Sequence, residues 1–205
     1  MQMRTLLLAA ALVLTAAQLR AEETDPVMEV TLLGTGTSAV RPHRLGPATL
    51  VEAGEEVLLF DAGRATTLRL RQAGIPLGSV DELFITHLHS DHVIGLPDLW
   101  LTGWVMGRQE VPLRIRGPKG TRALLEGLRA AYDYDIRIRQ EAGPKLPAAG
   151  MAIAVEQIGP GVVYEAAGVR VTAFEVDHGP IKPAFGFRVD YKGRSVVLSG
   201  DTRYS

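Results

Sequence analysis

The chain has 205 residues, 46% hydrophobic and 22% charged, a composition typical of a folded domain with a sizeable core rather than of a disordered segment. Its formal net charge is -1, so it lacks the basic excess that supports non-specific nucleic-acid binding. Cysteine is absent, which excludes a disulfide framework and leaves histidine and carboxylate as the ligands for any metal.

The N-terminal segment has the pattern of an export signal. Arg4 supplies positive charge, an apolar run of 12 residues covers 6–17, and Leu19-Arg-Ala21 is an acceptable cleavage site. The run is shorter than the roughly 20 residues that a membrane-spanning helix needs. We therefore expect a signal peptide at 1–21, a linker at 22–29, and a periplasmic or secreted protein without a membrane span. An uncleaved anchor and a buried helix are the alternatives.

Segments with strand and helix patterns follow one another along the rest of the chain. Strands are expected at 28–34, 48–53, 56–61, 83–86, 113–117, 135–139, 151–156 and 169–176, and in a hairpin of 185–191 and 194–201 that turns at Lys192-Gly193. Helices are expected at 64–73, at 93–103 with Pro97 in the first turn, and at 120–131. Because helices do not alternate strictly with strands, we predict a layered α/β or α+β fold rather than a doubly wound sheet.

Arginines alternate in two of the predicted strands, Arg114 with Arg116 and Arg137 with Arg139. They could form a phosphate-binding surface. We prefer the interpretation that they line the solvent face of half-buried strands.

Three of the five histidines fall within six residues, at the end of an apolar strand in Phe84-Ile-Thr-His-Leu-His-Ser-Asp-His92. His87 and His89 are two apart, so in an extended segment both can reach one metal. A turn into a helix would bring Asp91 and His92 to a second position, and two metals about 3.5–4 Å apart need about this density of ligands. Nitrogen and oxygen ligands suit zinc, with iron or manganese as alternatives.

His87-Leu-His-Ser-Asp-His92 resembles the His-x-His-x-Asp-His signature of the metallo-β-lactamase superfamily. Its surroundings are similar to the ribonuclease Z-like branch, which also includes zinc phosphodiesterases and arylsulfatase-like enzymes. The motifs that carry this resemblance are Gly34-Thr-Gly-Thr37, Phe60-Asp-Ala-Gly63, Ile85 to Pro97, Asp177-His178 before Phe185-Gly-Phe-Arg188, and Ser199-Gly-Asp-Thr202. The resemblance implies an αββα sandwich, with one hydrolase domain at 30–205.

The resemblance also implies a binuclear zinc site. Its ligands would be His87, His89 and His178 for one zinc, Asp91 and His92 for the second, and Asp201 as a bridge between the two. Asp61 and Thr86 would support these ligands, and Asp91 and Asp201 would take part directly in catalysis. A hydroxide held between the zincs would attack phosphorus, sulfur or a carbonyl carbon. His43 matches no ligand.

Two features depart from the pattern of that family. No histidine follows His178, so a final ligand to the second zinc and a His-Glu-Ala-Thr-like segment are missing, and we expect the chain to be incomplete at its C-terminus. Only 22 residues separate His178 from Asp201, an interval in which long-arm tRNA-processing members carry a protruding insertion.

These features together favour an exported binuclear zinc hydrolase that cleaves a phosphodiester, sulfate ester or related small-molecule ester. We expect nucleic acid to be an improbable partner and consider a homodimer possible. The alternatives are a ribonuclease Z-type 3′-tRNA-processing endonuclease and a non-catalytic metal-binding module or inactive fragment. A β-lactamase is disfavoured because those enzymes usually lack an aspartate at the position of Asp201.

Overall fold

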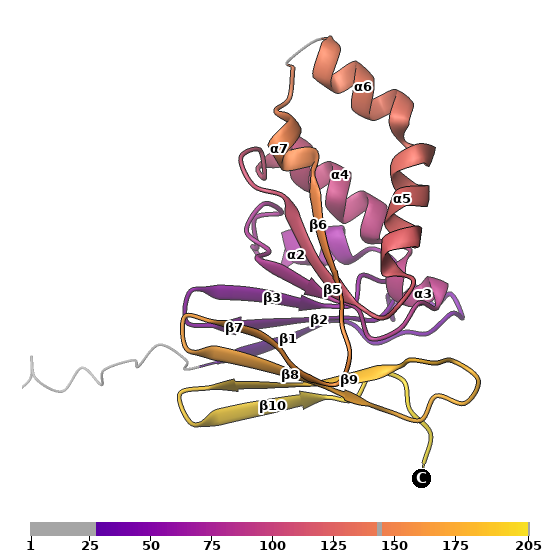
Figure 1. Ribbon diagram of the computed structural model, residues 1–205, viewed down its shortest axis with the longest axis vertical. Helices are drawn as coiled ribbons and strands as arrows, with labels where there is room; N and C mark the ends of the chain where they lie inside the picture. The colour runs from indigo at the N-terminus through magenta and orange to yellow at the C-terminus, as the bar shows by residue number, and fades with distance from the viewer. Residues whose placement is uncertain (1–27, 143–144, 205) are drawn as a thin grey trace, which may run out of the picture.

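The computed structural model describes residues 28–142 and 145–204. Within them two β-sheets pack face to face, and helices cover the outer face of the larger sheet (Figure 1). None of the helices in the described ranges is long and apolar enough to span a membrane. The predicted signal peptide at 1–21 and most of the predicted linker lie outside the described residues, so export stays a prediction.

The larger sheet has the strand order β1-β2-β3-β4-β5-β6. The strands are β1 (Glu29–Gly34), β2 (Ala48–Ala53), β3 (Glu56–Phe60), β4 (Glu82–Phe84), β5 (Leu113–Gly117) and β6 (Ile153–Gln157). β1, β2 and β3 pair antiparallel, whereas β3 to β6 pair parallel. The carboxyl ends of parallel strands share one edge of a sheet, so the segments that follow β3 and β4 emerge side by side there.

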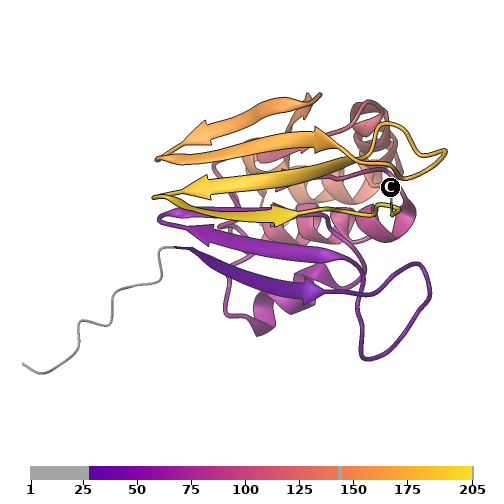
Figure 2. The same ribbon diagram turned by 90° about the horizontal axis from the view of Figure 1, so that it is seen from below.

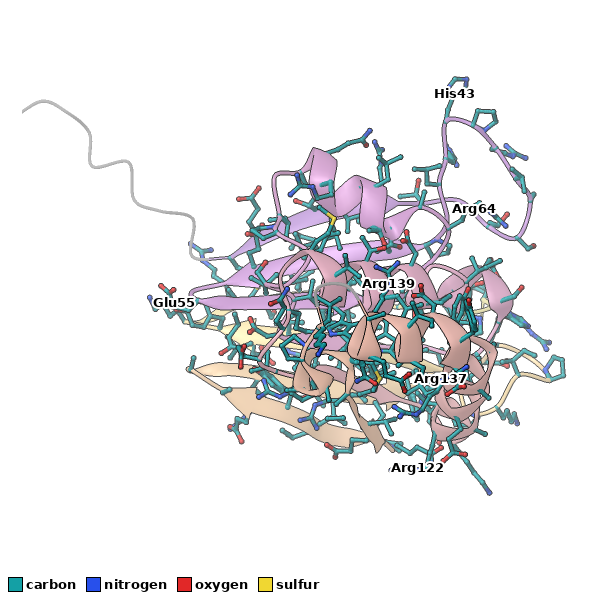
Figure 3. All side chains as sticks on the ribbon, turned by 90° about the horizontal axis from the view of Figure 1, so that it is seen from above. His43, Glu55, Arg64, Arg122, Arg137 and Arg139 are labelled. Carbon is teal, nitrogen blue, oxygen red and sulfur yellow. The ribbon has the colours of Figure 1, made fainter. Side chains whose placement is uncertain are left out.

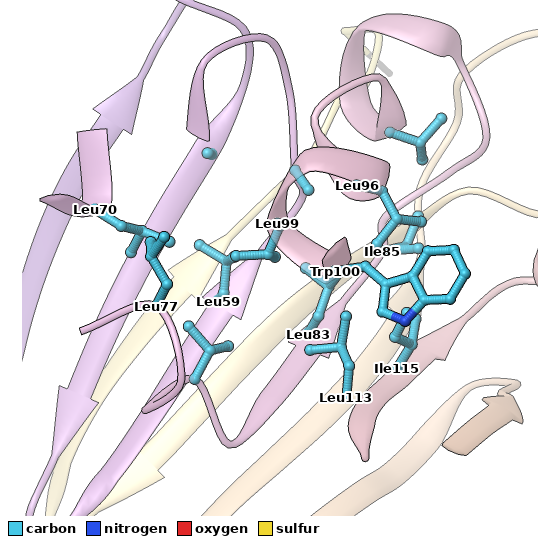
Figure 4. Close-up of a cluster of buried hydrophobic side chains, with 14 of the residues drawn as sticks. Leu59, Leu70, Leu77, Leu83, Ile85, Leu96, Leu99, Trp100, Leu113 and Ile115 are labelled. Carbon is cyan, nitrogen blue, oxygen red and sulfur yellow. The ribbon is translucent and has the colours of Figure 1, made fainter. Parts of the chain in front are cut away.

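Helices pack on one face of this sheet and close its core. They are α2 (Thr66–Gln72), α3 (Ser90–Val93), α4 (Leu96–Met106), α5 (Thr121–Ala131), α6 (Asp133–Glu141) and α7 (Ala148–Met151). α4 carries the predicted Pro97 in its first turn and buries Trp100, whose indole N–H donates to the carbonyl of Met151 over 2.8 Å. Figure 4 shows Trp100 among leucines and isoleucines of α4, β4 and β5. Paired in this way, the indole nitrogen can be buried without cost to the core.

The smaller sheet has the order β10-β9-β8-β7 and is antiparallel throughout. Its strands are β7 (Gly161–Ala166), β8 (Val169–Glu175), β9 (Phe185–Tyr191) and β10 (Arg194–Leu198). The predicted hairpin turn at Lys192-Gly193 is confirmed, and both residues have positive φ, 45° and 74°, which matches the twist of the strands. β7 was not expected from the sequence.

An aromatic cluster joins the two sheets. Phe60 and Phe84 of the larger sheet stack with ring centroids 4.9 Å apart, and Phe187 of β9 lies 5.5 Å from Phe84. Aromatic pairs in such arrangements add about 0.5–1.5 kcal/mol each beyond the burial of their area. Seen from below, the strands of the two sheets lie along nearly the same axis, with arrows pointing both ways, and the loops that follow β1 and β8 lie at the same end as the C-terminal segment (Figure 2).

The strand predicted at 135–139 is wrong, because this segment belongs to α6. Ile136 is buried, but Ile138 is 42% exposed, so the two isoleucines do not share the buried face that a strand would give them. Arg139 donates to Asp135, four residues earlier, over 2.8 Å. Such a pair and an acidic first turn both stabilise a helix. The alternation of isoleucine with arginine was therefore misleading.

The two pairs of alternating arginines lie on elements of different type. Arg114 and Arg116 lie on β5 as predicted, and Arg116 donates to the buried Glu82 over 3.1 Å. Arg137 and Arg139 lie on α6, so the interpretation of them as the wet face of a strand is wrong.

We predict that Ile136→Ala lowers the free energy of unfolding by about 2 kcal/mol or more, because it leaves a cavity under α6. Ile138→Ala, at the half-open position, is the matched control and should change it by less than about 1 kcal/mol. Urea unfolding monitored by circular dichroism measures both values. Equal losses for the two variants would contradict the helical assignment.

Candidate metal centre

Segments from both sheets meet at one end of the sandwich. Asp61 directly follows β3, and the segment with Thr86 and His87 follows β4. His178 lies in the loop between β8 and β9, and Asp201 follows β10. The residues of the histidine cluster and the two distant residues are thus brought together by the packing of one sheet on the other.

The histidine cluster turns from extended chain into helix, as predicted. His89 has an extended backbone, with φ -63° and ψ 144°, and α3 begins at the next residue. His87 and His92 are almost completely buried, at 0% and 2% exposed. Asp91 and His92 therefore project from α3 rather than from the extended segment.

Three imidazole nitrogens converge in a first ligand group. Nε2 of His87 lies 2.9 Å from Nδ1 of His89, which lies 3.3 Å from Nε2 of His178. Bonds of about 2.0–2.1 Å at tetrahedral angles hold the ligand nitrogens of a zinc ion roughly 3.3 Å apart. The structure thus brings together the three histidines predicted for one zinc, at a spacing that suits such an ion.

A second group consists of His87, His92 and Asp201. One carboxylate oxygen of Asp201 lies 3.5 Å from Nε2 of His92, and the other lies 3.9 Å from Nε2 of His178. Asp201 therefore lies between the two groups, where a bridging ligand was predicted. Asp91 lies at the margin, with a carboxylate oxygen 3.9 Å from Nε2 of His92. His87 belongs to both groups, which the sequence did not indicate.

Asp61 lies on the buried side of the ligands and holds Thr86 and His92 by hydrogen bonds. It is 5% exposed, and its φ of 60° lies in the left-handed region that aspartate tolerates better than most residues. One carboxylate oxygen accepts the N–H of Thr86 over 2.8 Å, and the other accepts Nδ1–H of His92 over 2.7 Å. Because the hydrogen of the neutral ring is on Nδ1, Nε2 of His92 presents a lone pair to the centre.

The surroundings of Nε2 of His92 test whether a metal ion fits this site. This nitrogen is buried, it has no hydrogen-bond partner among residues 28–142 and 145–204, and it faces the carboxylate of Asp201. A buried lone pair opposite an anionic oxygen is unfavourable unless a cation lies between them. The donor set and this unpaired nitrogen together suit a metal ion.

The electrostatics of the two buried histidines differ. Burial, followed by the neighbouring His92, lowers the pKa of His87 to about 4, so His87 is neutral at physiological pH, the form that binds metals. Burial also acts to lower the pKa of His92. The hydrogen bond and charge of Asp61 outweigh it, so the pKa of His92 is raised.

Two glycines that the sequence did not single out as functional let α3 approach the Asp61 loop. A Cβ on Gly63 would lie 2.6 Å from the carbonyl oxygen of Asp91, and one on Gly95 would lie 2.1 Å from the carbonyl oxygen of Gly63. Both contacts exclude any side chain. Gly63 and Gly95 lie within the motifs Phe60 to Gly63 and Ile85 to Pro97, and this position in the sequence could have identified them as part of the site.

Comparison with known proteins places the chain among ribonuclease Z-like proteins. A family model described as "Anti-Pycsar protein Apyc1" matches residues 28–205. The ribonuclease Z of Mycobacterium sp. (strain KMS) is 43% identical over 177 residues, which cover 86% of this chain and 62% of that protein. The ribonuclease Z of Mycobacterium bovis (strain BCG / Pasteur 1173P2) is 38% identical over 180 residues. This chain thus spans less than two thirds of the length of these relatives.

Solved structures agree with the predicted fold. Human tRNase Z, short form, superposes with a TM-score of 0.65 at 27% identity, covering 84% of this chain and 68% of that one. The metallo-beta-lactamase fold protein YhfI from Bacillus subtilis superposes with a TM-score of 0.63 at 21% identity, covering 87% and 64%. The predicted metallo-β-lactamase sandwich is therefore confirmed.

The expectation of a small-molecule ester as substrate, with nucleic acid an improbable partner, is wrong. The relatives are named ribonuclease Z and tRNase Z, names that specify RNA. The short interval between His178 and Asp201 had argued against tRNA.

Asp61→Asn is predicted to weaken zinc binding about 10–100-fold, because the amide no longer offers His92 a charged acceptor. Titration of metal-free protein with zinc against a chromophoric chelator measures the affinity. The control is Asp190→Asn, which breaks an exposed ion pair with Arg188 on β9 and should leave zinc affinity unchanged. Equal affinities in wild type and Asp61→Asn would refute the supporting role of Asp61.

Proposed function

Since this chain belongs to the family described as Anti-Pycsar protein Apyc1, in the ribonuclease Z-like branch of the metallo-β-lactamase superfamily, we propose that it is a zinc-dependent phosphodiesterase that cleaves RNA. Its class as a metal-dependent hydrolase follows from its relatives. The use of two zinc ions and the cleavage of precursor tRNA at its 3′ side belong to the proposal.

The single observation that carries the proposal is the position of Asp201, whose two carboxylate oxygens lie 3.5 Å from Nε2 of His92 and 3.9 Å from Nε2 of His178, between the ligands predicted for the two zinc ions. Zinc bound in such groups supplies a hydroxide near neutral pH and neutralises charge on phosphoryl oxygens. The ligands differ in access: the side chain of His92 is 2% exposed, whereas that of Asp201 is 47% exposed. A phosphodiester would therefore approach from the side of Asp201, while Asp61 holds His92 from the buried side.

An exposed basic loop beside the centre supports RNA as the substrate. The loop at 35–47 contains Arg41, His43 and Arg44 and no acidic residue, and all three basic side chains are exposed. Figure 3 shows His43 at the tip of this loop and Arg64 near its base. Arginine contacts to phosphates supply much of the affinity of a protein for nucleic acid.

Backbone hydrogen bonds tie the base of this loop to the ligand segment. The N–H of Gly63 donates to the carbonyl of Pro47 over 2.9 Å, and the N–H of Ala62 donates to the carbonyl of His92 over 2.8 Å. The loop at 35–47 is therefore fixed within two backbone contacts of a predicted metal ligand. An RNA strand bound along the loop would be directed to the centre.

The first test is cleavage of a precursor tRNA with a 3′ trailer by the purified, zinc-loaded protein. We expect release of the trailer and, for His89→Ala, a fall in rate of at least about 100-fold, because the first ligand group loses a nitrogen. Glu55→Gln, in the turn between β2 and β3, is the control and should retain full activity. A zinc-loaded wild-type protein that leaves this RNA intact would contradict the proposal.

The second test is the salt dependence of RNA binding. Arg41→Gln with Arg44→Gln should weaken binding and make the slope of log K against log salt shallower, by about 0.7 for each phosphate of a single-stranded RNA that the variant no longer neutralises. Filter binding over a range of salt concentrations measures this slope. Arg137→Gln, on α6 away from the loop in Figures 1 and 3, should leave it unchanged. The same slope in all three proteins would remove the loop from the RNA-binding surface.

A further inference from the structure

Thr86 lies at the junction of several segments that build the candidate centre. It is 3% exposed and follows β4 directly before His87. Its carbonyl accepts the N–H of Phe185, at the start of β9, over 2.9 Å. Its side chain has two chemically different parts, a hydroxyl and a methyl, and each faces a different part of the centre.

The hydroxyl of Thr86 lies between Asp61 and His87. Its oxygen is 2.9 Å from a carboxylate oxygen of Asp61 and 3.0 Å from Nδ1 of His87. A hydroxyl has one hydrogen, and an ionised carboxylate can only accept, so Thr86 donates to Asp61 and accepts from Nδ1–H of His87. This places the ring hydrogen of His87 on Nδ1 and leaves the lone pair of Nε2 facing the other ligands. Asp61 thus fixes the ring tautomer of His92 directly and that of His87 through Thr86.

The hydrocarbon side of Thr86 packs against the turn before Asp201. A Cβ on Gly200 would lie 3.1 Å from both Cβ and Cγ2 of Thr86, so the two residues are in close contact. Gly200 has φ 59°, a conformation that glycine adopts without strain. The methyl of Thr86 therefore limits how the turn that carries Asp201 can approach the histidines.

We propose that Thr86 is a positioning residue with two separable roles: its hydroxyl fixes the ring tautomer of His87, and its methyl fixes the turn that presents Asp201. Thr86 would act through these neighbours and not by touching metal or substrate. Serine has only the hydroxyl and valine only the branched hydrocarbon, so threonine alone among the three combines both. The inference rests on the proposed metal centre, but it concerns the ligands before any ion binds.

The test uses histidine ring nitrogen NMR on metal-free protein, together with zinc affinity. In the wild type His87 should carry its hydrogen on Nδ1. Thr86→Val should lose this fixed tautomer and bind zinc about 10–100-fold more weakly. Thr86→Ser should keep the tautomer, which is a rescue by the conservative change. Without the methyl, the amide signals of Gly200 and Asp201 should shift or broaden in Thr86→Ser and remain close to wild type in Thr86→Val.

Thr67→Val is the matched control, because Thr67 is also buried and its hydroxyl has no hydrogen-bond partner in the part of the chain that the structure describes. It should change neither the His87 tautomer nor zinc affinity. An Nε2–H tautomer of His87 in the wild type would overturn the inference even if Thr86→Val failed to fold, and so would a Thr86→Val protein that kept the tautomer and the affinity. A wild type with the expected tautomer and zinc affinity that cuts no RNA would overturn the proposed function alone.

Discussion

The carboxylate of Asp61 is the group on which the candidate centre depends. It accepts hydrogen bonds from the amide and hydroxyl of Thr86 and from the ring of His92, all of them buried. A buried carboxylate is stable only when donors surround it, and these donors are fixed in return. One of them, the ring of His92, belongs to the histidine cluster itself. A single acidic residue at the end of β3 thereby orients a ligand on α3 and, through a hydroxyl, a ligand that follows β4.

Packing between the sheets determines the rest of the geometry. The larger sheet supplies Asp61 and the histidine cluster, whereas the smaller sheet supplies His178 and Asp201. The contact of Phe187 with Phe84 holds the sheets together, and Phe84 lies only three residues before His87. Distances such as the 3.3 Å between His89 and His178 therefore depend on a core that is itself apolar. Binding of one ion by residues of both sheets would add to the stability of the sandwich, because metal binding and folding are coupled.

The sequence allowed much of this to be predicted, for identifiable reasons. Residues two apart in an extended segment point the same way, so the convergence of His87 and His89 followed from their spacing, while the ligand roles of His178 and Asp201 depended on the family resemblance. The α6 segment was misjudged because alternation in five residues cannot distinguish a strand from an exposed helix with one buried isoleucine. The expectation that nucleic acid is an improbable partner rested on a net charge of -1, which averages over the chain and does not show that the loop at 35–47 carries only basic charges. Sharing of His87 between two groups is a property of three-dimensional packing that spacing does not encode.

The unequal exposure of the ligands also has a consequence for exchange kinetics. His87 and His92 close the centre from the protein side, whereas Asp201 leaves it open to solvent. Ions would therefore enter and leave on the side of Asp201, from which the proposed phosphodiester substrate would also approach. If the proposed RNA substrate occupied that side, it would slow the loss of metal, and a chelator would compete with it for access. The lifetime of the metal-bound protein would then depend on how freely ions and substrate pass Asp201, and not only on the strength of the bonds to the buried ligands.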